Sequence, residues 1–186
     1  DPKNKSTKTI IKNLSFANGV CLSNDGVSIL YAETFGCRIS QYWFDGPNKG
    51  NNRVIIDNLP GYPDNINRSS DGQYWLALVG MRGPALDLAL TMPGFRKRMA
   101  RRVANSEWLY PNINTGCVIK FSEDGVVSDS LWDLGGVNHP MVTSMREHKG
   151  YLYLGGISNN RIGKYKIPGA DSKWEGYADY WGGGNV

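Results

Sequence analysis

The chain has 186 residues, of which 40% are hydrophobic and 20% charged, the composition of an ordinary globular protein. No apolar run comes near the roughly 18 residues that span a bilayer, and the first ten residues lack the hydrophobic region of a signal peptide. The net charge of +4 is mostly local, because five basic residues fall within 96–102, so we do not expect a nucleic-acid partner.

Three segments, which begin at Thr9, Arg53 and Asp129, share one order of predicted elements. Each has an apolar strand, a passage rich in Gly, Pro and Asn, a second strand, a tight turn and a third apolar strand. The turn residue Asp71 follows its counterpart Asp25 by 46 residues (71 − 25), which is close to the roughly 40 to 50 residues of a propeller blade. The repeat therefore predicts an all-β chain built as β-propeller blades.

The predicted strands do not make a closed propeller. We assign 1–167 to the propeller and 168–186 to a tail. Over 7–167 we expect a lone outer strand at 7–14, two complete four-stranded blades and a last blade of three strands. So few blades would leave sheet faces and edges open to water. We therefore expect the last three to four blades of a larger propeller, whose N-terminal half would be a separate chain or a cleaved fragment.

The segment 84–108 interrupts the repeat and is predicted to be helical. Phe95, Met99 and Val103 recur at four-residue spacing among basic residues, which indicates an amphipathic helix, and Pro93 separates it from a shorter helix. We favour a lid that lies on the propeller. The alternative is a peripheral membrane contact through the basic helix, Phe95 to Val103.

The cysteines Cys21, Cys37 and Cys117 have no metal-ligand spacing, and two of them lie in apolar strand-like runs, so we expect buried thiols. The odd count leaves open a bridge to a segment outside the chain. N-glycosylation triplets, which are used only in a secreted protein, begin at Asn4, Asn13 and Asn67. A secreted, periplasmic or endomembrane-lumen location is slightly favoured, and the compartment stays open.

Oxygen-bearing side chains take equivalent places in successive blades. Asn18 and Asp64 both lie seven residues before a tight turn, Asn65 aligns with Gly19, and Thr143 takes the place of Asn65 in the last blade. The innermost strand of each blade lines the central channel, so Asn18, Asp64 and Asn65 should converge at one mouth of it. Carboxylate and amide oxygens suit Ca²⁺, which takes six to eight of them, so further ligands would come from the missing blades.

Three motifs, "FANGV" (16–20), "PGYPDNI" (60–66) and "REHKGYLYLGG" (146–156), resemble the strictosidine synthase-like branch of the six-bladed propellers that also includes gluconolactonase and the paraoxonases. The resemblance implies the C-terminal half of such a propeller. It also implies that Asn18, Asp64 and Asn65 help to bind a central Ca²⁺ or another divalent cation, which activates a lactone, ester or phosphotriester. The place of the catalytic Glu of strictosidine synthase falls on Thr143, whose hydroxyl cannot replace a carboxylate as base.

We therefore predict a Ca²⁺-dependent hydrolase of lactone or ester bonds that acts on a small molecule. His139 is the candidate general base toward a metal-bound water, and a capping or packing role in the "NHP" turn is the alternative for it. Two other functions stay open. One is a non-catalytic binding propeller with a structural metal, and the other is a strictosidine synthase-like lyase.

Overall fold

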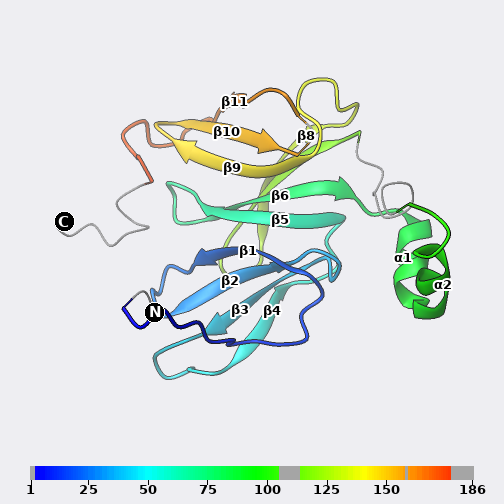
Figure 1. Ribbon diagram of the computed structural model, residues 1–186. Helices are drawn as coiled ribbons and strands as arrows, with labels where there is room; N and C mark the ends of the chain where they lie inside the picture. Colours follow the sequence, from blue (N-terminus) through cyan, green and yellow to red (C-terminus); the bar gives the residue numbers. More distant parts are fainter. Residues whose placement is uncertain (1–2, 105–113, 158, 177–186) are drawn as a thin grey trace.

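The fold was analysed in a computed structural model that describes residues 3–104, 114–157 and 159–176. Two four-stranded antiparallel sheets and one three-stranded sheet lie one above the other (Figure 1). The first sheet holds β1 (Ala17–Leu22), β2 (Ser28–Glu33), β3 (Arg38–Trp43) and β4 (Asn52–Ile56). The second holds β5 (Gly61–Arg68), β6 (Tyr74–Met81), β7 (Gly116–Phe121) and β8 (Val127–Asp133). The third holds β9 (Val142–His148), β10 (Tyr151–Gly156) and β11 (Gly163–Lys166).

The sheets are propeller blades, as the repeat predicted. In each sheet the strands pair in chain order, and β5 packs against both β1 and β9. The first strands of the three sheets therefore lie side by side and form one wall of the channel.

The core consists of two layers, one on each face of the middle sheet. Along β6, Tyr74, Leu76 and Leu78 pack toward the first sheet, whereas Trp75 and Ala77 pack toward the third. All five side chains are fully buried. This alternation explains why "YWLALVG" reads as one continuous apolar run, because both faces of a central blade are covered.

The segment 7–14 forms no strand, contrary to the expectation of a lone outer strand. A strand is stable only when a neighbour pairs with its backbone N–H and C=O groups, and the partner strands that the pattern requires are not in this chain. The segment is nearly all exposed and leads into β1.

The insertion forms two short helices, α1 (Pro84–Thr91) and α2 (Pro93–Met99), which project from the end of β6 (Figure 1). The break before Pro93 was predicted, but α2 ends at Met99 and does not reach Val103. Helix α1 buries Leu86 in the core between the first two sheets, whereas α2 has no buried residue. The predicted insertion also included 105–108, which lie outside the described residues.

All three cysteines are buried free thiols, which confirms the prediction. Burial raises the pKa of the Cys117 thiol to about 12. Across the described residues, no helix has the length and hydrophobicity to cross a membrane.

Candidate functional site

Each innermost strand has a β-bulge at the same level of the channel. The pairing register shifts around Asn18 and Gly19 in β1, around Asp64 and Asn65 in β5, and at Thr143 in β9. These are the positions that the repeat alignment made equivalent. A bulge re-aims side chains away from the regular pleat, and bulges are frequent beside active sites.

The backbones of β1 and β5 touch at these bulges. A Cβ atom at Gly19 would lie 2.2 Å from the carbonyl oxygen of Asp64 and 2.7 Å from the Cα of Asn65, so no side chain fits there. Glycine at this position lets Asn18 approach Asp64 across the boundary between two blades.

The three predicted ligands form one polar cluster that spans all three sheets. Asn18 lies close enough to Asp64 for its amide to lower the pKa of that carboxylate, and its Nδ2 donates a hydrogen bond to Thr34 Oγ1 at 3.2 Å. Asn65 Nδ2 donates to Asp64 Oδ1 at 3.1 Å and to the carbonyl oxygen of Thr143 at 2.8 Å. The structure therefore brings together Asn18, Asp64 and Asn65, as the sequence predicted.

Asp64 is a half-buried carboxyl group that pairs with no Lys or Arg side chain of the described residues. Burial raises its pKa to about 6, and the nearby Asn18 amide acts in the opposite direction. No Lys or Arg contributes to the pKa. At neutral pH the group is ionised, so the cluster carries a negative charge that amide groups alone stabilise.

The oxygen atoms of Asn18, Asp64 and Asn65 are the type of ligand that a hard divalent cation prefers, but they are too few to complete its coordination. One carboxylate and two amide oxygens are ligands of the type that Ca²⁺ prefers, but Ca²⁺ takes six to eight. Among the described residues, no group of three or more His, Cys, Asp or Glu side chains could hold a metal ion. A cation bound here would complete its coordination with water molecules or with ligands from outside this chain.

An aromatic row that the sequence analysis did not single out comes from residues one or two positions away from Asn18, Thr34 and Asp64 in the chain. The ring centroids of Phe16 and Phe35 are 5.3 Å apart, and those of Phe35 and Tyr62 are 6.3 Å apart. Phe16 is 56% exposed although it directly precedes β1, and its φ of 64° lies in the left-handed region, which is unfavourable for an aromatic residue. The sequence signal that could have identified Phe16 was its position in "FANG", two residues before the predicted ligand Asn18.

His139 does not lie with the cluster. It lines a cavity of about 510 Å³ between the outer strands of the second and third sheets, and the lining includes none of the three predicted ligands. Its backbone N–H donates to Asp133 Oδ2 at 2.7 Å. Burial and the nearby Arg161 lower the pKa of the imidazole, which disfavours its protonated form. Neither ring nitrogen forms a hydrogen bond to the described residues, so this geometry favours the packing alternative for His139.

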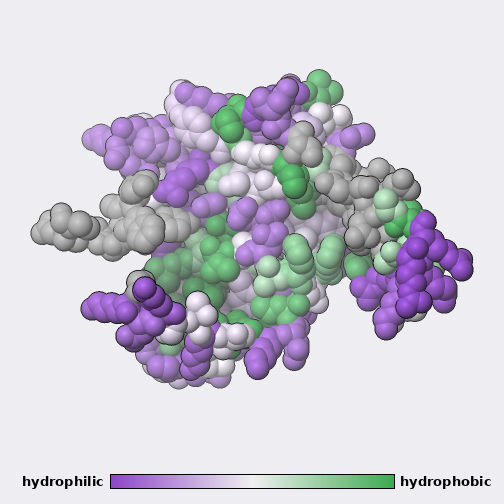
Figure 2. Space-filling view, in the orientation of Figure 1, coloured by the Kyte–Doolittle hydropathy of each residue, from purple (hydrophilic) through white to green (hydrophobic). Residues whose placement is uncertain are grey.

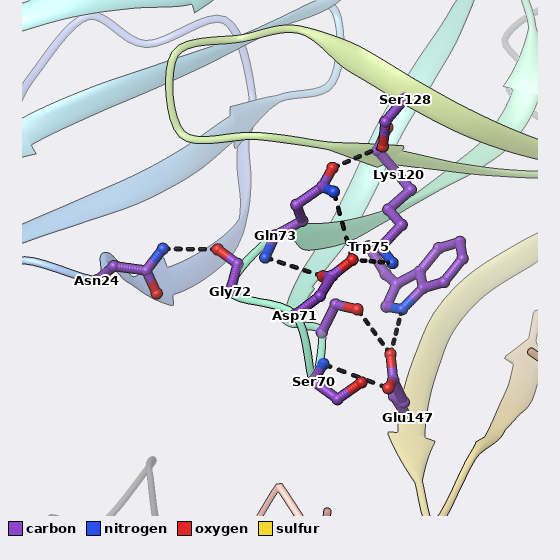
Figure 3. A network of polar contacts seen from close by, with 10 residues as sticks. Asn24, Ser70, Asp71, Gly72, Gln73, Trp75, Lys120, Ser128 and Glu147 are labelled. Atoms are coloured by element: carbon purple, nitrogen blue, oxygen red, sulfur yellow. Dashed lines mark hydrogen bonds and ion pairs between the residues drawn. The ribbon is translucent and has the colours of Figure 1, made fainter. Parts of the chain in front are cut away.

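Among the residues that the structure describes, two carboxylates are fully buried, and each has a complete set of partners. Glu147 accepts hydrogen bonds from Ser69 Oγ (2.8 Å), Ser70 N (3.2 Å) and Trp75 Nε1 (2.7 Å), which tie the third sheet to the second (Figure 3). Glu33 forms an ion pair with Arg38 at 2.7 Å. Because their oxygens are occupied, we assign both residues to structure rather than to chemistry.

Comparison with known proteins agrees with these motifs. The strictosidine synthase family matches residues 1–47. Protein STRICTOSIDINE SYNTHASE-LIKE 10 of Arabidopsis thaliana is 34% identical over 171 residues, which are 90% of this chain and 46% of that protein. The adipocyte plasma membrane-associated protein of Salmo salar is 36% identical over 171 residues, or 90% of this chain and 41% of that protein.

Solved structures show the same fold at low sequence identity. A luciferin-regenerating enzyme superposes with a TM-score of 0.55 and 18% identity, over 88% of this chain and 49% of that one. A gluconolactonase from Xanthomonas campestris superposes with a TM-score of 0.52 and 14% identity, over 87% of this chain and 48% of that one. Three blades that match about half of each neighbour agree with a propeller of six blades.

The chain spans slightly less than half the length of the curated relatives that it matches. The fold, the motifs and the sequence matches agree along most of its length. They confirm the resemblance that the motifs indicated, and the chain is similar over 90% of its length to a strictosidine synthase-like protein.

Proposed function

We propose that Asn18, Asp64 and Asn65 hold part of a divalent-cation site, with Ca²⁺ as the expected ion, in a hydrolase of lactone or ester bonds. The observation that carries the proposal is the convergence of three oxygen-bearing side chains at equivalent bulges of the inner strands. If Asp64 and Asn65 only capped a local turn, they would not need to occupy repeat positions equivalent to that of Asn18. The ionised Asp64, which pairs with no Lys or Arg of the described part of the chain, supplies the negative charge that such an ion requires.

Hydrogen bonds around the cluster hold the proposed metal ligands in place. Asn65 donates to Thr143 O and to Asp64 Oδ1, so its amide is fixed between β9 and its own strand. Thr34 Oγ1 donates to Pro63 O at 2.8 Å and accepts from Asn18, so it fixes the Asn18 amide against β5. Metal-ligating side chains that are already fixed lose little conformational entropy when an ion binds.

The proposed chemistry follows from this arrangement. A bound Ca²⁺ would polarise the carbonyl of a lactone or ester and lower the pKa of a bound water. Phe16 and Phe35, which lie within two residues of Asn18 and Thr34 in the chain, offer an exposed apolar surface for the carbon skeleton of the substrate. The gluconolactonase neighbour shares the fold alone, but its name agrees with a lactone as substrate.

The position of Thr143 argues against the alkaloid condensation. Thr143 lies at the bulge of β9, and its carbonyl oxygen is engaged by Asn65. Its side chain has no carboxylate to act as base. A hydrolase therefore fits this cluster better than a strictosidine synthase-like lyase.

The metal site is tested by titrating the chain with Ca²⁺ in a calorimeter. We expect heat of binding for the unchanged chain, none for Asp64→Asn, and unchanged binding for Asp129→Asn, which removes an exposed carboxylate from β8. Equal Ca²⁺ affinity in Asp64→Asn and Asp129→Asn would rule out the site.

The reaction is tested separately with a panel of lactones and aryl esters, before and after chelation. We expect turnover that chelation abolishes. Ca²⁺ that binds without turnover of any substrate would instead support a binding propeller with a structural metal.

A further inference from the structure

The two helices α1 and α2 present large apolar side chains to water around the point where they join. Leu88 is 62% exposed, Met92 is 46% exposed and Phe95 is 37% exposed. The three residues fall within eight positions, and α2 contributes no buried residue to the core. Exposed apolar residues that gather in this way usually mark a contact surface.

The same segment carries a concentrated positive charge. Residues 88–104 contain no Asp or Glu, and their cations are Arg96, Lys97, Arg98, Arg101 and Arg102. Within the described part of the chain none of these five forms an ion pair. The nearest acid in sequence, Asp87, pairs with Arg82 at 3.0 Å. In Figure 2 the helices are mostly purple on the side in view, with green residues at their border.

We propose that this surface, formed by α1, α2 and residues 100–103, binds an anionic lipid bilayer. Leu88, Met92 and Phe95 enter the boundary between headgroups and acyl chains, while the basic side chains stay at the level of the lipid phosphates. A nucleic acid or a sulfated glycan would satisfy the cations but leave the apolar side chains in water. The combination therefore favours a membrane over a soluble polyanion, and it is independent of the proposed metal site.

The helices are attached firmly enough to act as an anchor. Leu86 and Ala89 of α1 are buried, and Arg82 Nη1 donates to Asn58 Oδ1 at 2.6 Å beside the ion pair to Asp87. Substitutions at the exposed positions should therefore leave the propeller folded, because they remove no buried contact.

The proposal is tested by sedimenting the chain with vesicles of phosphatidylcholine alone and of phosphatidylcholine mixed with phosphatidylserine. We expect binding to the mixed vesicles only. Each cation near such a surface contributes about fivefold in affinity, so reversal of two charges in Lys97→Glu/Arg98→Glu should weaken binding by at least about thirtyfold. Leu88→Ser/Phe95→Ser should also weaken it strongly. Lys8→Glu/Lys12→Glu, which reverses two exposed charges before β1, is the matched control and should bind normally.

Insertion is measured by a fluorophore that brightens in hydrocarbon, attached to Met92→Cys. The three native thiols are buried and will not compete for the label. Brightening at Met92 but not at a labelled Asn48→Cys, in the exposed loop between β3 and β4, supports the proposal. Binding to heparin without binding to mixed vesicles would overturn it, and so would vesicle binding that Leu88→Ser/Phe95→Ser leaves unchanged.

Discussion

Substitution of Gly19 by alanine tests the close approach of β1 and β5 that positions the candidate site. The added Cβ would lie 2.2 Å from Asp64 O, 2.7 Å from Asn65 Cα and 2.8 Å from Ile66 N, whereas ordinary contact begins at 3.4 Å. All three atoms belong to the backbone of β5, so no side-chain rotation relieves the overlap. The two strands must separate by about 1 Å at the site.

Overpacking of this kind costs typically about 1 to 3 kcal/mol, and we expect the upper end because backbone atoms are involved. For a chain of this length about 3 kcal/mol corresponds to a fall in melting temperature of about 6 to 12 °C. Urea unfolding followed by circular dichroism measures the change in the free energy of unfolding. The matched control is Gly155→Ala in β10, whose Cβ would meet no atom closer than 4.0 Å and which should unfold as the unchanged chain does.

Equal stability of Gly19→Ala and Gly155→Ala would refute the close approach, and with it the geometry that brings Asn18 to Asp64. If Gly19→Ala is destabilised as expected, it should also lose Ca²⁺ affinity, because the added methyl group displaces Asp64 and Asn65.

Three further predictions concern the buried polar groups and thiols. Glu147→Ala should lower the free energy of unfolding by about 3 kcal/mol, because Trp75 Nε1 and Ser69 Oγ lose their acceptor in the core; an unchanged urea midpoint would contradict this. Burial raises the pKa of Glu33, but hydrogen bonds from Arg38 and Ser15 outweigh it and hold that pKa below 4.5. The stabilisation by Glu33 is therefore complete above about pH 4.5 and is lost as the pH falls further. In urea unfolding, Glu33→Gln should have a lower free energy of unfolding than the unchanged chain at pH 7, and the two values should converge in acid. Ellman's reagent should react with no cysteine of the folded chain and with all three in urea, because the thiols are buried; rapid reaction of Cys117 without denaturant would contradict its burial.

Much of the fold and the central part of the candidate site could be predicted from local sequence pattern. The Asp-Gly and Lys-Gly turns fix where each hairpin reverses, and the strand period of two then fixes which positions are equivalent between blades. This register placed Asn18, Asp64 and Asn65 at one end of the inner strands before any contact was known, and the bulges of β1 and β5 lie there.

Other features depend on which sheets become neighbours, which no local pattern specifies. Glu147 reads as an ordinary residue next to a turn, but packing of β9 against the second sheet buries it under Trp75. His139 reads as a candidate base near the channel, but the path of the chain into β9 places its ring in a cavity between outer strands.

Sequence alone determined the blade repeat and the three oxygen-bearing side chains, because turn chemistry and strand alternation act over a few residues. Tertiary structure decided that 7–14 stays unpaired, that α2 ends at Met99 without joining the core, and that Asp64 pairs with no basic side chain of the described residues. These outcomes depend on partners distant in sequence, since strand pairing, helix burial and the charge around a carboxylate are all set by what packs against them.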